Sequence, residues 1–160
     1  MKQLLLLRHA QAEEAHAGLA DLDRPLSPRG RAEACAAAQC IALAGLRCDA
    51  IWVSPAARTA QTAQIVLSEL GLKLQLAFQP EFYLGNPDAL LAPLGHCASE
   101  VQALLMIGHN PGLSELAQRF NGDAPEIELR TAGLCLIRFA PAASWGNLRP
   151  QWVAGLQLLR

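Results

Sequence analysis

The chain begins with the stretch Leu4-Leu5-Leu6-Leu7-Arg8-His9-Ala10, in which four leucines run directly into an arginine and a histidine. A short, wholly apolar run of this kind is typical of a strand that is buried on both faces of a parallel sheet. A guanidinium and an imidazole at the end of such a strand are costly to bury without partners. They therefore indicate a functional site at this position.

Two further apolar runs end in the same way. The run Ile51-Trp52-Val53 is followed by Arg58, and the run at 103–107 is followed by His109. Ligands of open α/β sheets bind beyond the carboxyl ends of the strands. We therefore predict that Arg58 and His109 meet the pair at the end of the first strand.

Strand-like and helix-like patterns alternate along the chain, which predicts an α/β fold. We expect a three-layer sandwich whose mostly parallel central sheet is flanked by helices, built as a single domain over residues 1–160. Strands are expected over 3–7, 48–53, 72–78, 101–107, 134–139 and 151–158, the fourth of them central and the last two a hairpin. Helices are expected from Pro28 to Gly45 with Ser27 as N-cap, over 55–70, over 88–99 with Pro93 inside, and over 111–120.

Composition limits the classes of partner. The chain of 160 residues is 52% hydrophobic and 17% charged, which predicts a globular domain with its own core. The net charge of −1 offers no basic field for nucleic acid or for a membrane surface. The leucine run is too short for a signal peptide, and the five cysteines show no C-x-x-C spacing. We therefore expect reduced thiols and a cytoplasmic protein.

The residues at the strand ends suit phosphoryl transfer. Such a reaction spreads negative charge over three oxygens, and arginine binds these oxygens with a planar fork that stays charged. Arg8 and Arg58 could grip the group from two sides, with Arg58 on the first turn of a helix that itself favours an anion. His9 could attack phosphorus as a neutral nucleophile. His109 would hydrogen-bond a phosphoryl oxygen, or else cap the helix that follows.

The order of these motifs resembles that of the histidine phosphatase superfamily. The segment Leu7-Arg8-His9-Ala10 resembles the R-H-G signature of that family, with Ala10 in the place of glycine. The segment Ser54-Pro55-Ala56-Ala57-Arg58-Thr59-Ala60 resembles its second-arginine motif, and Gly108-His109-Asn110-Pro111-Gly112 resembles its second-histidine motif.

A fourth segment narrows the resemblance. The stretch Asp21-Leu22-Asp23-Arg24-Pro25-Leu26-Ser27, with Gly30, is similar to one in the small SixA-type phosphohistidine phosphatases. The resemblance implies a phosphoglycerate-mutase-like fold, with His9 as the phosphorylated nucleophile. It also implies a phosphate pocket, formed by Arg8, Arg58 and His109.

The roles of three further residues are left open. Larger members of the family carry a glutamate after the third strand that protonates the leaving group, and Glu81 holds that place here; it is either this general acid or a solvated loop carboxylate. Asp21 and Arg24 either line the mouth of the pocket and touch substrate, or form an ion pair that orders their loop.

We predict a phosphatase that works through a covalent phosphohistidine, without metal or organic cofactor. The histidines and cysteines lack zinc-ligand spacing. The resemblance and the short chain, with few insertions to cover a small metabolite, favour phosphohistidine on another protein as substrate. One alternative is a small-molecule phosphomonoesterase, and another is a non-catalytic phosphate- or phosphoprotein-binding module on the same fold.

Overall fold

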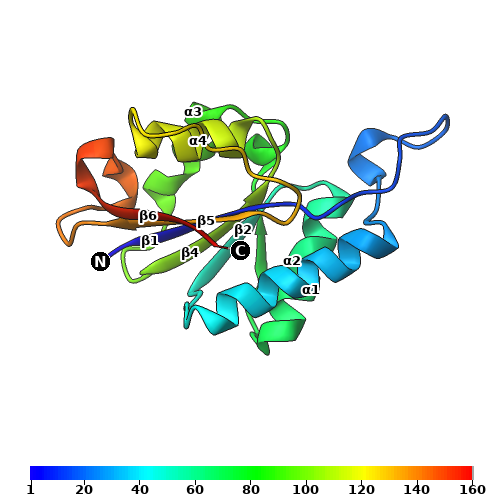
Figure 1. The fold of residues 1–160 in the computed structure, drawn as a ribbon, viewed down its shortest axis with the longest axis horizontal. Helices are drawn as coiled ribbons and strands as arrows, with labels where there is room; N and C mark the ends of the chain where they lie inside the picture. The colour runs from blue at the N-terminus through cyan, green and yellow to red at the C-terminus, as the bar shows by residue number, and fades with distance from the viewer. Residues whose placement is uncertain (160) are drawn as a thin grey trace.

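The computed structural model, which describes residues 1–159, is a sandwich of three layers (Figure 1). Its middle layer is a six-stranded sheet in the order β3-β2-β4-β1-β5-β6. The strands are β1 (Gln3–Arg8), β2 (Ala50–Val53), β3 (Leu76–Phe78), β4 (Ala103–Gly108), β5 (Leu134–Phe139) and β6 (Val153–Leu159). The first four run parallel, and β5 is antiparallel to both of its neighbours. The predicted α/β sandwich and the C-terminal hairpin are confirmed.

Helices cover both faces of the sheet. Helices α1 (Pro28–Leu43) and α2 (Ala57–Leu70) lie on one face, and α3 (Pro87–Leu91) and α4 (Gly112–Asn121) lie on the other (Figure 1). Short 3-10 turns cover Asp21–Asp23, Pro80–Phe82, Ala92–His96, Trp145–Asn147 and Pro150–Trp152. None of the helices within residues 1–159 has the length and apolar character needed to cross a bilayer.

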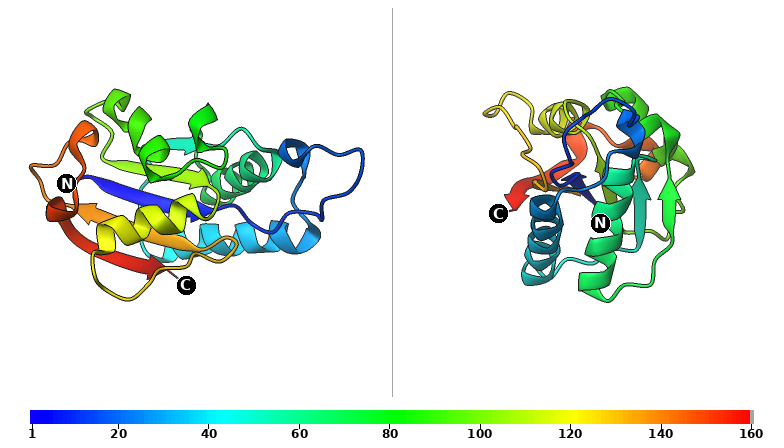
Figure 2. Two further views of the ribbon diagram at one scale, coloured as in Figure 1. Left: turned by 90° about the horizontal axis from the view of Figure 1, so that it is seen from above. Right: turned by 90° about the vertical axis from the view of Figure 1, so that its right-hand side faces the viewer.

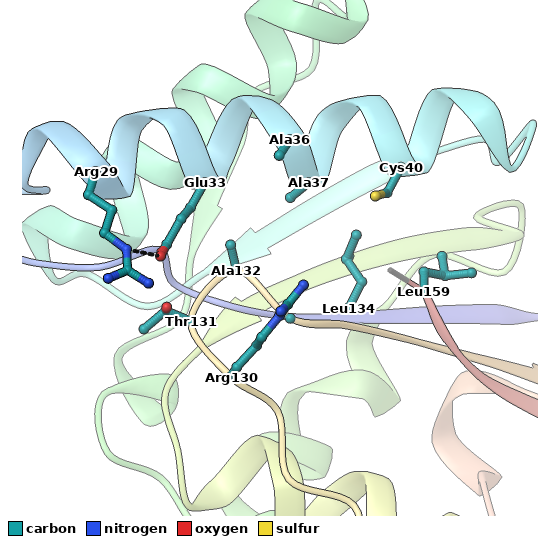
Figure 3. A pocket seen from close by; sticks show the side chains of 11 residues that line it. Arg29, Glu33, Ala36, Ala37, Cys40, Arg130, Thr131, Ala132, Leu134 and Leu159 are labelled. Carbon is teal, nitrogen blue, oxygen red and sulfur yellow. Dashed lines mark hydrogen bonds and ion pairs between the residues drawn. The ribbon is translucent and has the colours of Figure 1, made fainter.

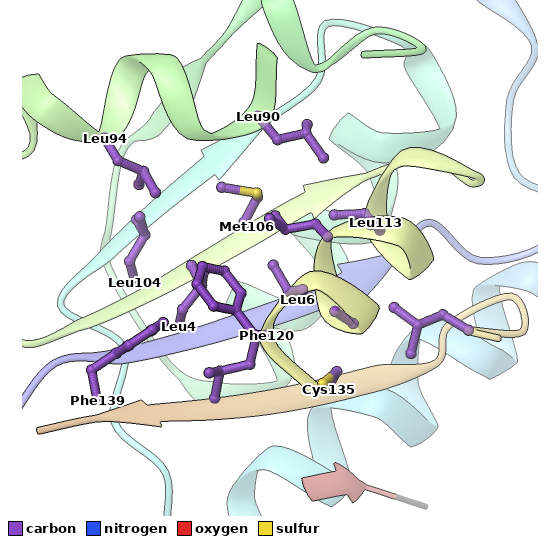
Figure 4. Close-up of a cluster of buried hydrophobic side chains, with 14 of the residues drawn as sticks. Leu4, Leu6, Leu90, Leu94, Leu104, Met106, Leu113, Phe120, Cys135 and Phe139 are labelled. Atoms are coloured by element: carbon purple, nitrogen blue, oxygen red, sulfur yellow. The ribbon is translucent and has the colours of Figure 1, made fainter. Parts of the chain in front are cut away.

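The four leucines of β1 alternate between two cores, which explains why the run is apolar throughout. Leu4 and Leu6 pack under α3 and α4 together with Phe120 (Figure 4). Leu5 and Leu7 pack against α1 and α2 on the opposite face. All four side chains are fully buried, and each contributes roughly 1.5–3 kcal/mol of hydrophobic stabilisation.

Local signals placed most helix ends correctly. The hydroxyl of Ser27 accepts the Gly30 N–H at 3.0 Å, and Pro28 occupies the first turn of α1. Gly71 ends α2 with a left-handed φ of 63°. Three elements are clearly shorter than expected. Strand β2 covers only the last four residues of the expected 48–53, and the edge strand β3 covers only the last three of the expected 72–78, which pair with β2. Helix α3 gives way to a 3-10 turn where Pro93 cannot donate a helical hydrogen bond.

The loop from residue 10 to residue 27 projects beyond the carboxyl end of β1 (Figure 2, left). It returns to the body of the protein at α1, where Ser27 N–H donates to the Gln11 carbonyl at 3.0 Å. A Cβ on Gly30 would overlap that same carbonyl, so this approach of loop to helix requires glycine. The loop is thereby fixed over the end of the sheet.

Candidate active site

The ends of three neighbouring strands bring the four principal predicted residues together. Strands β1 and β4 are paired in parallel, with Arg8 opposite Gly108, so His9 and His109 emerge side by side. Their ring centroids lie 5.1 Å apart. Arg58 stands on the first turn of α2, directly after β2, and its Nη2 lies 3.4 Å from Nδ1 of His109.

The hydrogen bond of His9 to the next residue fixes its tautomer. Nδ1 lies 2.7 Å from the Ala10 carbonyl oxygen, which can only accept, so Nδ1 carries the hydrogen. The lone pair is therefore on Nε2. Burial, with the charges of Arg58 and Arg8 beside it, lowers the pKa of His9 to about 4. At neutral pH the ring is uncharged and nucleophilic at Nε2.

Ala10 stands where the family signature has glycine, and its methyl group lies in the protein interior. Its side chain is fully buried beside Leu26 and Ala34. Its N–H donates to Oγ1 of Thr62, one turn along α2 from Arg58, at 3.1 Å. The methyl group thus packs into a small apolar cluster, and Thr62 ties the backbone after His9 to the helix that carries Arg58.

His109 is buried and neutral. Its Nε2 lies 2.8 Å from Oγ of Ser54, and burial, with His9 and Arg58 close by, lowers its pKa to about 3. Arg58 has only donors, so Nδ1 of His109 accepts and Nε2 carries the hydrogen that Ser54 accepts. Ser54 lies within the second-arginine motif, but the sequence analysis gave it no role. The structure makes it the residue that orients His109.

In Arg8 and in Arg58, the terminal nitrogens of the guanidinium make hydrogen bonds to the protein, whereas Nε has no partner. Arg8 donates from Nη1 to the Leu129 carbonyl at 2.9 Å, and Arg58 donates from Nη1 to the Asp21 carbonyl at 2.7 Å. Among the side chains of residues 1–159, the Nε atoms of Arg8 and Arg58 are the only buried nitrogen or oxygen atoms without a hydrogen-bond partner. Such donors are costly to leave unsatisfied. A tetrahedral oxyanion would supply the acceptors that they lack.

Asp21 joins the site through Arg58. Its carboxylate accepts from Nη2 of Arg58 at 3.0 Å, from Nε of Arg24 at 2.9 Å and from the hydroxyl of Tyr83 at 2.6 Å. The Tyr83 hydrogen bond, followed by those from Arg58 and Arg24, holds the pKa of Asp21 well below its usual range. The same contact raises the pKa of Tyr83. Asp21 is therefore an ionised acceptor and Tyr83 a protonated donor.

Tyr83 is a site residue that the sequence analysis missed. Its ring meets that of His109 edge-on, with centroids 5.6 Å apart. The predicted acid Glu81 is exposed on the turn Pro80–Phe82, and it makes no hydrogen bond or ion pair with any residue from 1 to 159. Tyr83 is the only tyrosine of the chain and stands two residues after the predicted acid. Its place in the sequence, so close to Glu81, was the one indication that Tyr83 belongs to the site.

A separate cavity of about 360 Å³ lies between α1 and the segment before β5 (Figure 3). Its walls include Arg29 and Glu33, which form an ion pair at 3.1 Å, and Arg130. None of the four principal site residues lines it. The backbone of its wall is hydrogen-bonded to two of them: Ala132 N–H donates to the His9 carbonyl at 3.2 Å, and Arg8 N–H donates to the Gly133 carbonyl at 3.1 Å. The four principal residues therefore lie at the strand ends and outside the lining of this cavity.

The donor set of the site suits an anion better than a cation. Guanidinium groups have no lone pair to offer a metal, and the two imidazoles are its only neutral nitrogen ligands. Within residues 1–159, histidine, cysteine, aspartate and glutamate side chains nowhere gather in a group of three that could hold a metal ion.

Comparison with known proteins places the chain among phosphatases. Residues 4–82 match the model of the histidine phosphatase superfamily, branch 1. An uncharacterised chloroplastic protein of Arabidopsis thaliana is 30% identical over 153 residues, which cover 90% of this chain and 69% of that protein. An uncharacterised protein of Picosynechococcus is 33% identical over 144 residues, 88% of this chain and 87% of the relative.

Solved structures agree with the sequence relatives. A candidate SixA phosphohistidine phosphatase from Nakamurella multipartitia superposes with a TM-score of 0.80 at 29% identity, over 99% of this chain and 95% of that one. A second, from Agrobacterium tumefaciens, gives a TM-score of 0.76 at 29% identity, over 85% of this chain and 91% of its own.

Proposed function

The chain belongs to the histidine phosphatase superfamily and is of the SixA type, and from this premise we propose that it removes a phosphoryl group from phosphohistidine on another protein. The proposal includes a covalent intermediate on His9. The observation that carries it is the pair of buried, unpaired Nε donors on Arg8 and Arg58 beside a neutral imidazole. The two donors would bind phosphoryl oxygens, and the neutral imidazole would attack the phosphorus.

In the first step, Nε2 of His9 attacks phosphorus. The bond from phosphorus to the substrate nitrogen breaks, and its electron pair leaves with the substrate imidazole. Charge on the equatorial oxygens is met by Arg8 and Arg58, which are already oriented by Leu129 and Asp21. The Nδ1 hydrogen of His9, held by the Ala10 carbonyl, lets the phosphorylated ring share its positive charge with that carbonyl.

In the second step, water attacks phosphorus on the other side of the intermediate. The N–P bond breaks, its electron pair returns to Nε2 of His9, and the proton lost by water leaves on the released phosphate. His9 is then restored as the neutral tautomer with which the cycle began. Splitting the transfer in this way replaces one difficult displacement by two easier ones.

The preference for a nitrogen leaving group is supported by the lack of a positioned acid. An alkoxide needs a proton in the transition state, whereas a phosphohistidine imidazole can leave already protonated. Of the groups near the pocket, Asp21 is held ionised and Tyr83 donates its hydrogen to Asp21. The side chain of Glu81 is exposed and makes no hydrogen bond or ion pair with any residue from 1 to 159. The two SixA structures of 29% identity point to the same substrate class.

Parallel turnover assays test this proposal. Purified protein is given a phosphohistidine protein, a phosphoserine peptide and a panel of phosphometabolites, each with and without a chelator. We expect the highest kcat/KM on the phosphohistidine protein, no effect of the chelator, and inhibition by vanadate. A preference for a metabolite would favour the small-molecule phosphomonoesterase. Tight phosphate binding without turnover would favour the non-catalytic binding module.

Trapping the intermediate tests the nucleophile independently of substrate preference. Labelled substrate followed by a rapid quench at alkaline pH should leave label on His9, and acid treatment should release it. The variant His9→Ala should carry no label. Label that survives this substitution, or that resists acid as a phosphoserine ester does, would overturn the assignment.

A further inference from the structure

The guanidinium of Arg58 is engaged on one edge and free on the other. Its terminal edge, Nη1 and Nη2, is bound by Asp21 through the backbone carbonyl at 2.7 Å and the carboxylate at 3.0 Å. Its side edge holds the unpaired Nε, and Nη2 on that edge meets only Nδ1 of His109, at 3.4 Å. Arg58 is 2% exposed, so both edges lie inside the protein.

Asp21 is itself held from two sides. Arg24, three residues away in the same loop, donates to Oδ1, and Arg24 also donates from Nη1 to the Glu13 carbonyl at 2.8 Å. Tyr83 donates to Oδ2 from the opposite wall of the site. The segment that carries Tyr83 is packed closely on α4, because a Cβ on Gly112 would overlap the Gly85 carbonyl. The carboxylate therefore stands at a fixed place relative to α2 and α4.

A carboxylate at this place is unsuited to bind the substrate phosphoryl group. It has no hydrogen to donate, and its negative charge repels a phosphoryl oxygen. From the sequence, Asp21 either touches substrate or forms an ion pair that orders the loop. The contacts indicate a third role, in which its partner is the arginine and not the substrate.

We infer that Asp21 is a positioning residue for Arg58. By binding the terminal edge of the guanidinium, it turns the side edge with Nε toward the place where the phosphoryl oxygens lie. Tyr83 completes the arrangement by holding the carboxylate against α2. This inference rests on the proposed function, since it assumes that a phosphoryl group is what Arg58 binds.

A double-mutant cycle in kcat tests the inference. Asp21→Ala removes the carboxylate and keeps the backbone carbonyl, and we expect kcat to fall roughly 10- to 100-fold, the scale of a misplaced catalytic group, with a smaller change in KM. In an Arg58→Ala background the same substitution should cost nothing further, because the group that it positions is gone. Asp21→Glu should recover part of kcat, and Asp21→Asn less, because the neutral amide binds a guanidinium weakly. Asp88→Asn, which loses an exposed ion pair with Arg119, is the matched control and should keep wild-type kcat.

Binding of inorganic phosphate, measured by calorimetry, separates this inference from the proposed function. We expect Asp21→Ala to weaken phosphate binding about 10-fold and Asp88→Asn to leave it unchanged. If the wild type binds phosphate with this dependence on Asp21 but turns over no substrate, the proposed function fails and the inference stands. Tighter phosphate binding in Asp21→Ala would show that the carboxylate competes for Arg58, and would overturn the inference. A full, additive loss of kcat in the Arg58→Ala background would overturn it as well, since Asp21 would then act through the fold.

Discussion

One hydrogen bond at His9 decides which ring nitrogen can attack. The Ala10 carbonyl takes the hydrogen of Nδ1, and burial with two arginines nearby keeps the ring neutral. In the proposed reaction, the same charges that disfavour the imidazolium would stabilise the bound phosphoryl group. The cost of placing cations beside an imidazole is therefore offset in the transition state, where their negative partner is present.

Substitutions at Arg58 test whether its planar geometry matters as well as its charge. Arg58→Ala should lower kcat/KM by at least about 10²-fold, the scale of losing one preorganised oxyanion donor. Arg58→Lys should restore little, because an ammonium cannot bind Asp21 on one edge and an oxyanion on the other. Steady-state kinetics on one substrate measures both, with the exposed Arg119→Lys as control. Near-normal rates in Arg58→Lys would show that only the positive charge of Arg58 matters and that its planar geometry does not.

A substitution at Glu81 tests whether this residue protonates the leaving group. If it reaches the substrate as a general acid, Glu81→Gln should lower turnover of an alkyl phosphomonoester by about 10²- to 10⁴-fold and spare a phosphohistidine protein. Its exposed position favours the other outcome, no loss on either substrate. Rates on the two substrates, compared with those of Glu69→Gln at the end of α2, decide between the two roles. Equal losses on both substrates would mean that Glu81 supports the pocket structurally.

At the scale of elements, the strand ends could be predicted and the contacts between loops could not. Residues Leu4 to Leu7 and the run at 103–107 are buried on both faces of the sheet, so an unbroken apolar sequence is enough to predict each strand. The two strands are parallel neighbours, and the polar residues that follow them, His9 and His109, therefore lie side by side. Tyr83 and Asp21 are 62 residues apart and lie in two loops without periodicity. Neither helical nor strand spacing connects them, so only the folded chain reveals their hydrogen bond.

Gly30 tests how the loop at residues 10–27 is attached to α1. Its Cβ would overlap the Gln11 carbonyl, so Gly30→Ala must push the loop off the helix or strain the backbone. We expect a loss of about 1–3 kcal/mol in the free energy of unfolding, typical of overpacking. Urea denaturation measures it. Gly95→Ala is the matched control, because the space around Gly95 is open and the added methyl group should be tolerated. Equal stability of the two variants would show that the loop yields freely.

If Asp21 positions Arg58 as we infer, Gly30→Ala should also reduce kcat at temperatures where the protein remains folded. The attachment of the loop to α1 would then affect both the free energy of unfolding and kcat.

At the scale of the whole molecule, the site makes the fold sensitive to acid. His9 and His109 are buried as neutral rings, with pKa values lowered to about 4 and about 3. In the unfolded chain each titrates near 6.5. Between pH about 6.5 and about 4 the unfolded state therefore binds more protons than the folded state, and the free energy of unfolding must fall as the pH falls.

The two histidines set the size of the expected loss in the free energy of unfolding. Each histidine contributes a slope of up to about 1.4 kcal/mol per pH unit, so lowering the pH from 7.5 to 5 should cost on the order of 2–4 kcal/mol. Asp21 does not offset the loss, because a lowered carboxylate pKa removes stability only at more acidic pH. Urea denaturation at half-unit steps of pH measures the slope, and His109→Gln, which removes one of the two buried rings, should reduce it by about half. Stability that stays constant from pH 7.5 to 5 would show that both rings take up protons in the folded protein as readily as in the unfolded chain, and would contradict the burial of His9 and His109 as neutral rings.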